Sequence, residues 1–120
     1  MEKKDLYRRT ESIQGTARFI STEKKAERAF AQWIPHIPET GSYAVYVSYQ
    51  SLPKSIDDAK YLVFHKGGVT EFTVNQRMGG GTWVYLGTFE FDKGTNEHGM
   101  VVLSNQSKQK GIVCADAVRF

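Results

Sequence analysis

The 120-residue sequence contains one cysteine, three prolines and no long apolar run. A single cysteine, Cys114, cannot form an internal disulfide, so a packed core must hold the fold together. No apolar stretch approaches the roughly 20 residues that cross a bilayer, which excludes a membrane-spanning helix. Cys114 lies within the apolar run IVCADAV, where we expect a small buried side chain and not a reactive thiol.

Catalytic and metal-binding motifs are also missing. Serines are numerous, but none lies in a GxSxG nucleophile motif. The glycines at 79–81 lack the Lys-Ser/Thr of a phosphate loop and lead into a predicted strand, which offers no helix dipole for an anion. His36, His65 and His98 are scattered without metal-site spacing, and His65 is expected to be a hydrogen-bonded histidine in the core or at its rim. We therefore expect the isolated chain to be no enzyme and to need no cofactor.

The whole chain has a net charge of +3, and the excess of positive charge is concentrated near its start. Residues 1–28 hold eight of the 16 Lys and Arg residues and five of the 13 acidic ones, which leaves eight of each sign for residues 29–120. A nucleic-acid-binding domain usually carries its basic residues as a patch on the folded surface. The neutral remainder therefore argues against a nucleic-acid partner. We expect residues 1–28 to form a polar, partly flexible lead-in with a first short strand at Thr16–Ile20.

Short β-type runs separated by turn signals fill the rest of the chain. Residues 42–49 alternate most clearly, with Val45, Val47 and Tyr49 on one face. A Gly-Gly pair at 67–68 between two such runs predicts a hairpin. Ser21–Ala31 has some helical spacing, but it is short and we favour a loop. The expected strands are 16–20, 29–34, 42–49, 61–65, 70–75, 83–91, 100–104 and 112–120.

This pattern predicts an all-β fold. About eight short strands with regular turn signals, and no alternation of strands with helices, are typical of a two-sheet antiparallel β-sandwich of the jelly-roll type. Residues 29–120 are expected to form this sandwich as a single module.

The run GGGTWVYLGTFEF at residues 79–91 is the most informative stretch. Every second residue from Trp83 to Phe91 is aromatic or glycine, which predicts a strand with an aromatic inner face. Glycine inside a strand often marks a bulge, and a bulge at Gly87 would turn Leu86 toward the core. The three leading glycines are expected to let the chain turn tightly before Trp83.

Asp116 shares a face with Val118 in the last predicted strand, so its carboxylate is expected to be carried partly inward. A buried carboxylate must be hydrogen-bonded or paired. We expect Asp116 to be a structural buried carboxylate that accepts backbone N–H bonds. The alternative is a cation site shared with Asp57, Asp58 or Asp92. No spacing of acidic residues matches a calcium-binding loop, but binding of a structural calcium ion is kept as an alternative.

Aromatic side chains are the best functional candidates, with two Trp, six Tyr and seven Phe in the chain. On a β-sandwich, exposed rings can form flat platforms against which sugar rings stack, whereas buried rings form the core. Three residues are the ligand-binding candidates. Tyr46 opposes the predicted core face of its strand, Trp33 lies beside a proline-rich turn, and the direction of Tyr85 depends on where the bulge falls.

Several ordered motifs resemble the golvesin/xanthan-lyase C-terminal, carbohydrate-binding-like domain family: GSYAVYVSY, DDAKYLVFHKGG, TEFTVNQ, GGGTWVYLGTFEF, VVLSN and ADAVRF. The resemblance covers about residues 33–120. It implies a β-sandwich appended to secreted bacterial enzymes that act on glycans or the cell envelope, including polysaccharide lyases. Such a domain is similar to carbohydrate-binding modules, which hold substrate near a separate catalytic domain. The resemblance supplies no specific binding residues.

Two functions fit these features. In the first, the chain is a non-catalytic accessory module that binds polysaccharide weakly through surface aromatics, which predicts a concavity with a solvent-facing ring. In the second, it is a structural or protein-interaction module that docks on its parent catalytic domain, which predicts an exposed apolar patch without a groove.

The location follows from the same reasoning. The N-terminal residues lack the apolar segment of a signal peptide, so the chain is either cytosolic or part of a longer secreted chain. The resemblance favours the second, and thus an extracellular, periplasmic or cell-surface location without membrane insertion.

Overall fold

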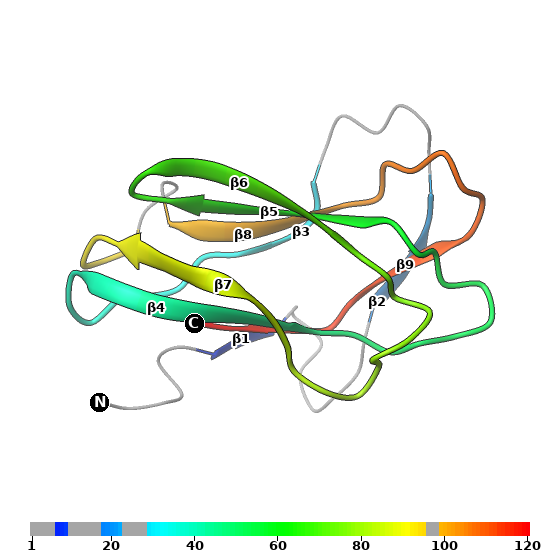
Figure 1. Cartoon of the computed structure of the whole chain (residues 1–120), viewed down its shortest axis with the longest axis horizontal. Helices are drawn as coiled ribbons and strands as arrows, with labels where there is room; N and C mark the ends of the chain where they lie inside the picture. The colour runs from blue at the N-terminus through cyan, green and yellow to red at the C-terminus, as the bar shows by residue number, and fades with distance from the viewer. Residues whose placement is uncertain (1–6, 10–17, 23–28, 96–98) are drawn as a thin grey trace.

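The computed structural model describes residues 7–9, 18–22, 29–95 and 99–120, and these residues form ten β-strands and no helix (Figure 1). The prediction of an all-β antiparallel sandwich is confirmed. In the described part of the chain there is accordingly no helix long and apolar enough to cross a membrane. The strands are β1 (Tyr7–Arg9), β2 (Arg18–Ser21), β3 (Ala29–Trp33), β4 (Gly41–Ser48), β5 (Ala59–His65), β6 (Gly68–Val74), β7 (Val84–Phe91), β8 (Met100–Ser104), β9 (Ile112–Ala115) and β10 (Ala117–Arg119).

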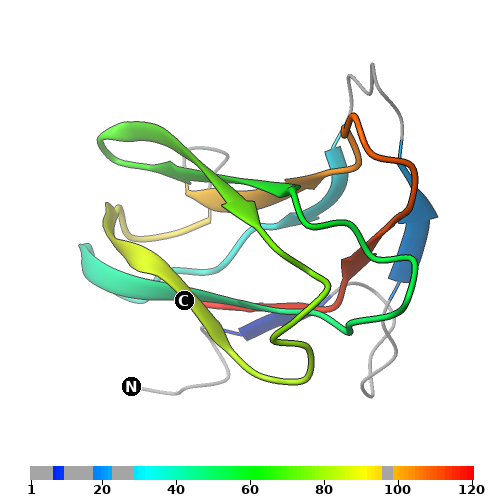
Figure 2. The same ribbon diagram turned by 45° about the vertical axis from the view of Figure 1, so that its right-hand side comes forward.

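Two four-stranded sheets form the layers of the sandwich. One has the strand order β1-β10-β4-β7 and the other β3-β8-β5-β6. Figures 1 and 2 show them as two facing layers, and the hydrophobic core draws buried side chains from both. A two-stranded sheet, β2-β9, lies at one end of the layers, to the right in Figure 1.

The lead-in contributes two of these strands. The strand expected at Thr16–Ile20 is present as β2, and β1 pairs with β10. Residues 1–6, 10–17 and 23–28 lie outside the described residues, and with them lies most of the predicted Ser21–Ala31 loop.

The core is built from alternating side chains, as predicted for β4, where Val45, Val47 and Tyr49 are buried. Trp33 is also buried, with 2% of its surface exposed. The prediction that Trp33 lies at the surface beside the proline-rich turn is therefore wrong. β3 pairs with β8, and this pairing directs Ala31 and Trp33 into the space between the sheets.

The predicted Gly-Gly hairpin is confirmed as β5-β6. Its register pairs His65 with Gly68, so the turn consists of Lys66 and Gly67 alone. His65 closes this turn. Its Nδ1 accepts a hydrogen bond from the Gly67 N–H at 3.1 Å, and its Nε2 lies 2.9 Å from the Thr70 hydroxyl. His65 thus has the structural role that the sequence indicated.

The predicted bulge in β7 is present. Val45 of β4 lies opposite Gly87, and the next residue, Tyr46, lies opposite Tyr85, so Leu86 is the extra residue. Leu86 packs against the core, as predicted. A Cβ added at Gly87 would lie 2.9 Å from Cζ of Phe89, so glycine leaves room for that ring.

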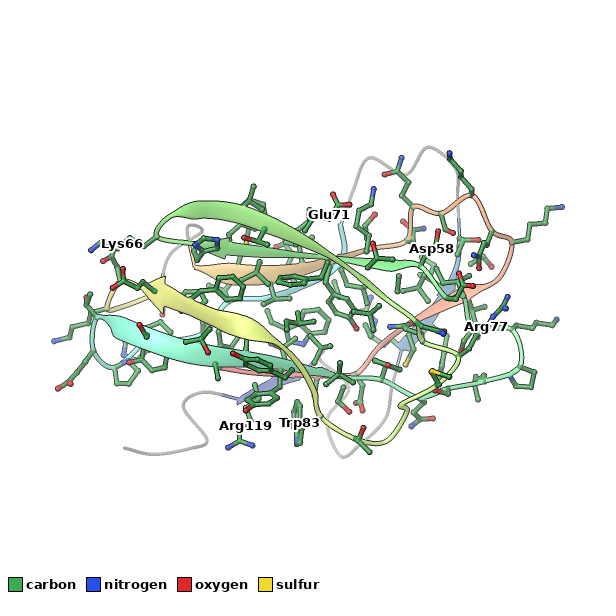
Figure 3. The ribbon with its side chains drawn as sticks, in the orientation of Figure 1. Asp58, Lys66, Glu71, Arg77, Trp83 and Arg119 are labelled. Carbon is green, nitrogen blue, oxygen red and sulfur yellow. The ribbon has the colours of Figure 1, made fainter. Side chains whose placement is uncertain are left out.

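Residues before the bulge lie on the face opposite to the predicted one. Val84 packs against the core, whereas Tyr85 is 55% exposed. Trp83, predicted to share the inner face with Phe89 and Phe91, is half-buried and projects from the outer side of the sheet in Figure 3. That prediction is wrong because the extra residue inverts the alternation.

The C-terminal residues 112–120 form two strands instead of one. β9 pairs with β2, and β10 pairs with β1 and β4, so the chain changes sheets at Asp116. Asp116 is half-buried between the buried Ala115 and Ala117. A half-buried Asp116 agrees with a carboxylate carried partly inward, and its role as an acceptor of backbone N–H bonds stays a prediction.

Candidate functional site

A groove of about 410 Å³ lies between β6 and β7, which are edge strands of the two layers. This volume is within the roughly 300–1,000 Å³ of typical ligand pockets. Most of its wall is apolar or aromatic. Its lining residues are Tyr49, Phe72, Thr73, Val74, Asn75, Met78, Gly79, Val84, Tyr85 and Leu86.

Tyr49 anchors the segment that leaves β6. Its ring is 2% exposed, and its hydroxyl lies 2.8 Å from the Met78 carbonyl oxygen and 3.2 Å from that of Asn75, to which it donates. Burial raises the pKa of Tyr49, which keeps the hydroxyl protonated and able to donate. The sequence pattern placed Tyr49 in the core but carried no sign of this anchoring role.

The glycines at residues 79–81 let the segment that follows β6 lie close to Tyr49 and Ser51. Gly79 has φ 78°, and a Cβ there would lie 3.0 Å from the Tyr49 hydroxyl oxygen. A Cβ at Gly80 would lie 2.5 Å from the backbone nitrogen of Ser51. Gly81 has φ 81° and donates its N–H to the Tyr49 carbonyl at 2.8 Å. The tight turn predicted for these glycines is confirmed.

Tyr85 forms the rim between the groove and the outer face of the sheet. Its ring centroid lies 5.3 Å from that of Tyr46, and its hydroxyl oxygen lies 2.7 Å from the Thr88 hydroxyl oxygen. The guanidinium carbon of Arg119 lies 5.5 Å from the centroid of the Tyr46 ring, a cation–π arrangement. Two of the three candidate aromatics, Tyr46 and Tyr85, therefore lie together, while Trp33 belongs to the core.

Polar groups accompany the aromatic wall. The exposed side chains of Thr73 and Asn75 line the groove, and Asn75 Oδ1 accepts the Arg77 N–H at 2.9 Å. That contact orients the Asn75 amide and leaves its NH₂ group as a donor. An apolar wall with a few directed polar groups suits a ligand that has an apolar face and a hydroxylated edge.

Gln76, next in the chain, is fully buried and was not singled out by the sequence. Its Oε1 accepts the Cys114 N–H at 2.8 Å, and its Nε2 donates to the Cys114 carbonyl at 2.9 Å and to the Tyr61 hydroxyl at 3.1 Å. The segment after β6 is thereby tied to β9 through the core. A single glutamine between two β-type runs gives no sequence signal that it will be buried and hydrogen-bonded in the core.

Cys114 is fully buried, as expected for a structural thiol. Burial raises its pKa to about 11, with a smaller contribution from the nearby charge of Asp116, while a hydrogen bond from the Gln50 N–H acts in the opposite direction. The thiol therefore stays protonated near neutral pH and is poorly suited to nucleophilic chemistry.

The alternative cation site does not form in the part of the chain that the structure describes. Three aspartates are the co-ligands considered for Asp116: Asp57, Asp58 and Asp92. Asp58 accepts a hydrogen bond from Ser107. Asp92 pairs with Lys66, whose ammonium is 3.6 Å away, and Figure 3 shows Lys66 at the end of the molecule opposite to Asp58. Among the described residues no three His, Cys, Asp or Glu side chains gather closely enough to hold a metal ion.

Known proteins resemble nearly the whole chain. A family model described as the Golvesin C-terminal domain matches residues 7–120. Xanthan lyase from Bacillus sp. (strain GL1) is 39% identical over 88 residues, which are 72% of this chain and 9% of the lyase. A solved structure of Paenibacillus xanthan lyase matches with a TM-score of 0.72 and 25% identity, covering 93% of this chain and 12% of that one. The chain thus spans about a tenth of the length of either lyase.

Proposed function

The chain belongs to the golvesin C-terminal domain family, and from this premise we propose that it is a non-catalytic accessory module that holds polysaccharide in the groove between β6 and β7. The similarity to about a tenth of xanthan lyase supports a place beside a separate catalytic domain in a longer chain. An enzyme that acts on an extracellular polysaccharide would carry this module outside the cell. The observation that carries the proposal is Tyr85, which is 55% exposed at the rim of the groove.

Tyr85 has the properties that sugar binding needs. One face of a pyranose ring presents C–H groups that pack against an aromatic ring, and the hydroxyl groups at its edge need hydrogen-bonding partners. Tyr85 supplies the ring, and Thr73 and Asn75 supply polar groups on the facing wall. The ring is also supported from behind by Tyr46, which limits its motion and so reduces the entropy lost on binding.

We expect the affinity of the single module to be weak. The groove is open, and one stacking ring with a few hydrogen bonds corresponds to a Kd on the order of 1 mM. Weak binding is sufficient for an accessory module, because attachment to the catalytic domain raises the effective concentration of polysaccharide at that domain.

A second candidate function is docking on the parent catalytic domain. Two neighbouring apolar residues of β2, Phe19 and Ile20, are 40% and 39% exposed. They favour a protein contact at the end sheet, away from the groove. The two functions use different surfaces, so variants can separate them.

Affinity electrophoresis through gels that contain single polysaccharides tests the proposal. We expect at least one glycan to retard the wild-type chain and Tyr85→Ala to lose at least five-fold in affinity, with Tyr85→Phe retaining most of it because the ring remains. Val69→Ala, at a 54% exposed position in the β5-β6 hairpin, is the matched surface control and should bind like wild type. Retardation by no glycan, or equal retardation of Tyr85→Ala, would overturn the proposal.

A further inference from the structure

A second hollow, of about 540 Å³, opens where the β2-β9 sheet meets the loops around residues 53–54 and 110–111. Three cations line it, and no carboxylate belongs to the described residues of its wall. We call it the basic cleft. Its lining residues are Ser21, Pro53, Lys54, Arg77, Lys110, Gly111 and Ile112.

Two hydrogen bonds anchor Arg77 at the wall of the cleft. Its Nε donates to the Ser55 carbonyl at 2.9 Å, and its backbone N–H donates to Asn75 Oδ1 at 2.9 Å. Within the described part of the chain, no protein acceptor is bonded to the two terminal NH₂ groups of the guanidinium. A guanidinium fixed through Nε presents those groups as a fork that matches the two oxygens of a carboxylate.

The two lysines come from loops that are clamped together. Ile112 donates its N–H to the Lys54 carbonyl at 2.9 Å. A Cβ at Gly111 would lie 2.5 Å from that same carbonyl oxygen, so only glycine permits the approach. The backbones of Lys54 and Lys110 are therefore fixed on neighbouring segments at the wall of one cleft.

The cations of the cleft have no direct carboxylate partner among the described residues. Asp57 and Asp58 accept hydrogen bonds from Gln109 and Ser107 and form no ion pair with these three cations. Like charges gathered in a hollow repel one another and attract an anion.

The cleft and the groove are lined by consecutive residues of the chain. Arg77 lines the cleft, and the next residue, Met78, lines the groove. Resting on the proposed function, we propose that the ligand is an acidic polysaccharide, with carboxylates of one part of the chain in the basic cleft and a neighbouring sugar against Tyr85. Nucleic acid fits less well, because residues 29–120 carry equal numbers of acidic and basic side chains.

Acidic polysaccharides and their uncharged forms test the inference. Polygalacturonate, alginate and hyaluronan are each compared with the same polymer after methyl esterification of its carboxylates, by affinity electrophoresis at 0.15 M NaCl. We expect at least one acidic polymer to bind at least ten-fold more tightly than its ester, and the affinity to fall as salt is added.

Charge-matched variants locate the site. Lys54→Gln/Lys110→Gln should lose about ten-fold in affinity for the acidic polymer, whereas Lys66→Gln/Lys93→Gln, with the same net charge, should lose less than two-fold. Arg77→Lys keeps the charge but removes the fork, and should lose about five-fold. Melting curves check that each variant is folded.

The outcomes separate the inference from the proposed function. If the acidic polymer and its ester bind equally well and Tyr85→Ala abolishes both, the inference that the ligand is acidic would be overturned. The proposed sugar binding in the groove would still hold. Binding of acidic polymers that depends equally on both lysine pairs would also overturn the cleft, as would equally tight binding of a short DNA duplex with the same variant losses. Binding of no glycan, charged or neutral, would overturn the proposed function and the inference with it.

Discussion

Replacing Gln76 with leucine tests how far one buried amide holds the end of the sandwich together. Gln76 is fully buried, and its side chain makes three hydrogen bonds, two of them to the backbone N–H and carbonyl of Cys114. Leucine has a similar volume but no polar atom. Gln76→Leu therefore leaves two buried backbone groups of Cys114 without partners, and the Tyr61 hydroxyl loses a donor.

The expected loss of stability follows from those orphaned groups. A buried donor or acceptor left unpaired costs about 1–3 kcal/mol, so the two backbone groups cost roughly 2–6 kcal/mol. Burying an apolar side chain instead of an amide returns about 1–2 kcal/mol. We expect the free energy of unfolding to fall by about 1–4 kcal/mol, a substantial part of the roughly 5–15 kcal/mol of a typical domain. The melting temperature would fall on the order of 10 °C.

Urea denaturation followed by tryptophan fluorescence measures this loss, because the buried Trp33 reports on the core. Gln32→Leu, at an exposed position in β3, is the matched control and should change stability by less than about 0.5 kcal/mol. If Gln76→Leu were as stable as Gln32→Leu, the hydrogen bonds of Gln76 would contribute no net stability and the reasoning would be refuted.

Gln76→Glu extends the same test to pH. A protonated glutamic acid at this position can accept from the Cys114 N–H and donate to its carbonyl, as the amide does, whereas the ionised form cannot donate. Burial should raise the pKa of the introduced carboxyl. The variant should therefore be most stable below the ordinary glutamate pKa and lose stability as the pH rises above it. A variant that is equally stable at pH 4 and pH 7 would contradict this account.

Three further changes test other contacts. Because burial raises the pKa of Cys114 to about 11, the native thiol stays protonated where the unfolded thiol ionises, so the free energy of unfolding should fall as the pH rises from about 9 toward 11. Cys114→Ala should flatten that slope in urea titrations, and an unchanged slope would exclude this thiol as its source. Gly111→Ala should destabilise the chain by about 1–3 kcal/mol, because its Cβ would meet the Lys54 carbonyl, whereas Gly41→Ala, with open space around it, should be nearly neutral in the same thermal melts. Tyr49→Phe should cost about 1 kcal/mol and also weaken glycan binding, since the loop beside the groove loses its anchor; unchanged retardation in a polysaccharide gel would show that the anchor does not matter for binding.

Local patterns predicted most of the strands. The alternation in β4 and the Gly-Gly turn after β5 depend on residues within one or two positions of each other, and both predictions are confirmed. The bulge at Gly87 was also predicted, because a glycine inside a strand is a local signal. Its consequence for Trp83 was not, since the face of a residue before a bulge depends on which residue is the extra one.

The errors concern pairing between distant parts of the chain. Trp33 stands next to a proline-rich turn, but its burial is decided by β8, nearly 70 residues later. Residues 112–120 were predicted as one continuous strand, whereas β9 and β10 pair with different neighbours.

The candidate site depends on the same long-range arrangement. Its groove requires β6 and β7 to lie at corresponding edges of two separate sheets, which no periodicity reports. The three cations of the basic cleft come from three separate loops, so no charge run marks them in the sequence. Only the half-buried Tyr46 and the exposed Tyr85 were accessible to pattern reasoning, because each opposes or interrupts a recognisable core face.

The extra residue in β7, Leu86, also affects how copies of the chain can associate through their sheet edges. β7 ends its sheet, and an unbroken outer strand offers its free backbone groups as a template on which another copy can add. At Leu86 the spacing of those groups is interrupted, and the strand bends. If the module binds polysaccharide as proposed, copies that lie side by side on one polymer would be hindered from pairing into a shared sheet, and each could still dissociate and rebind.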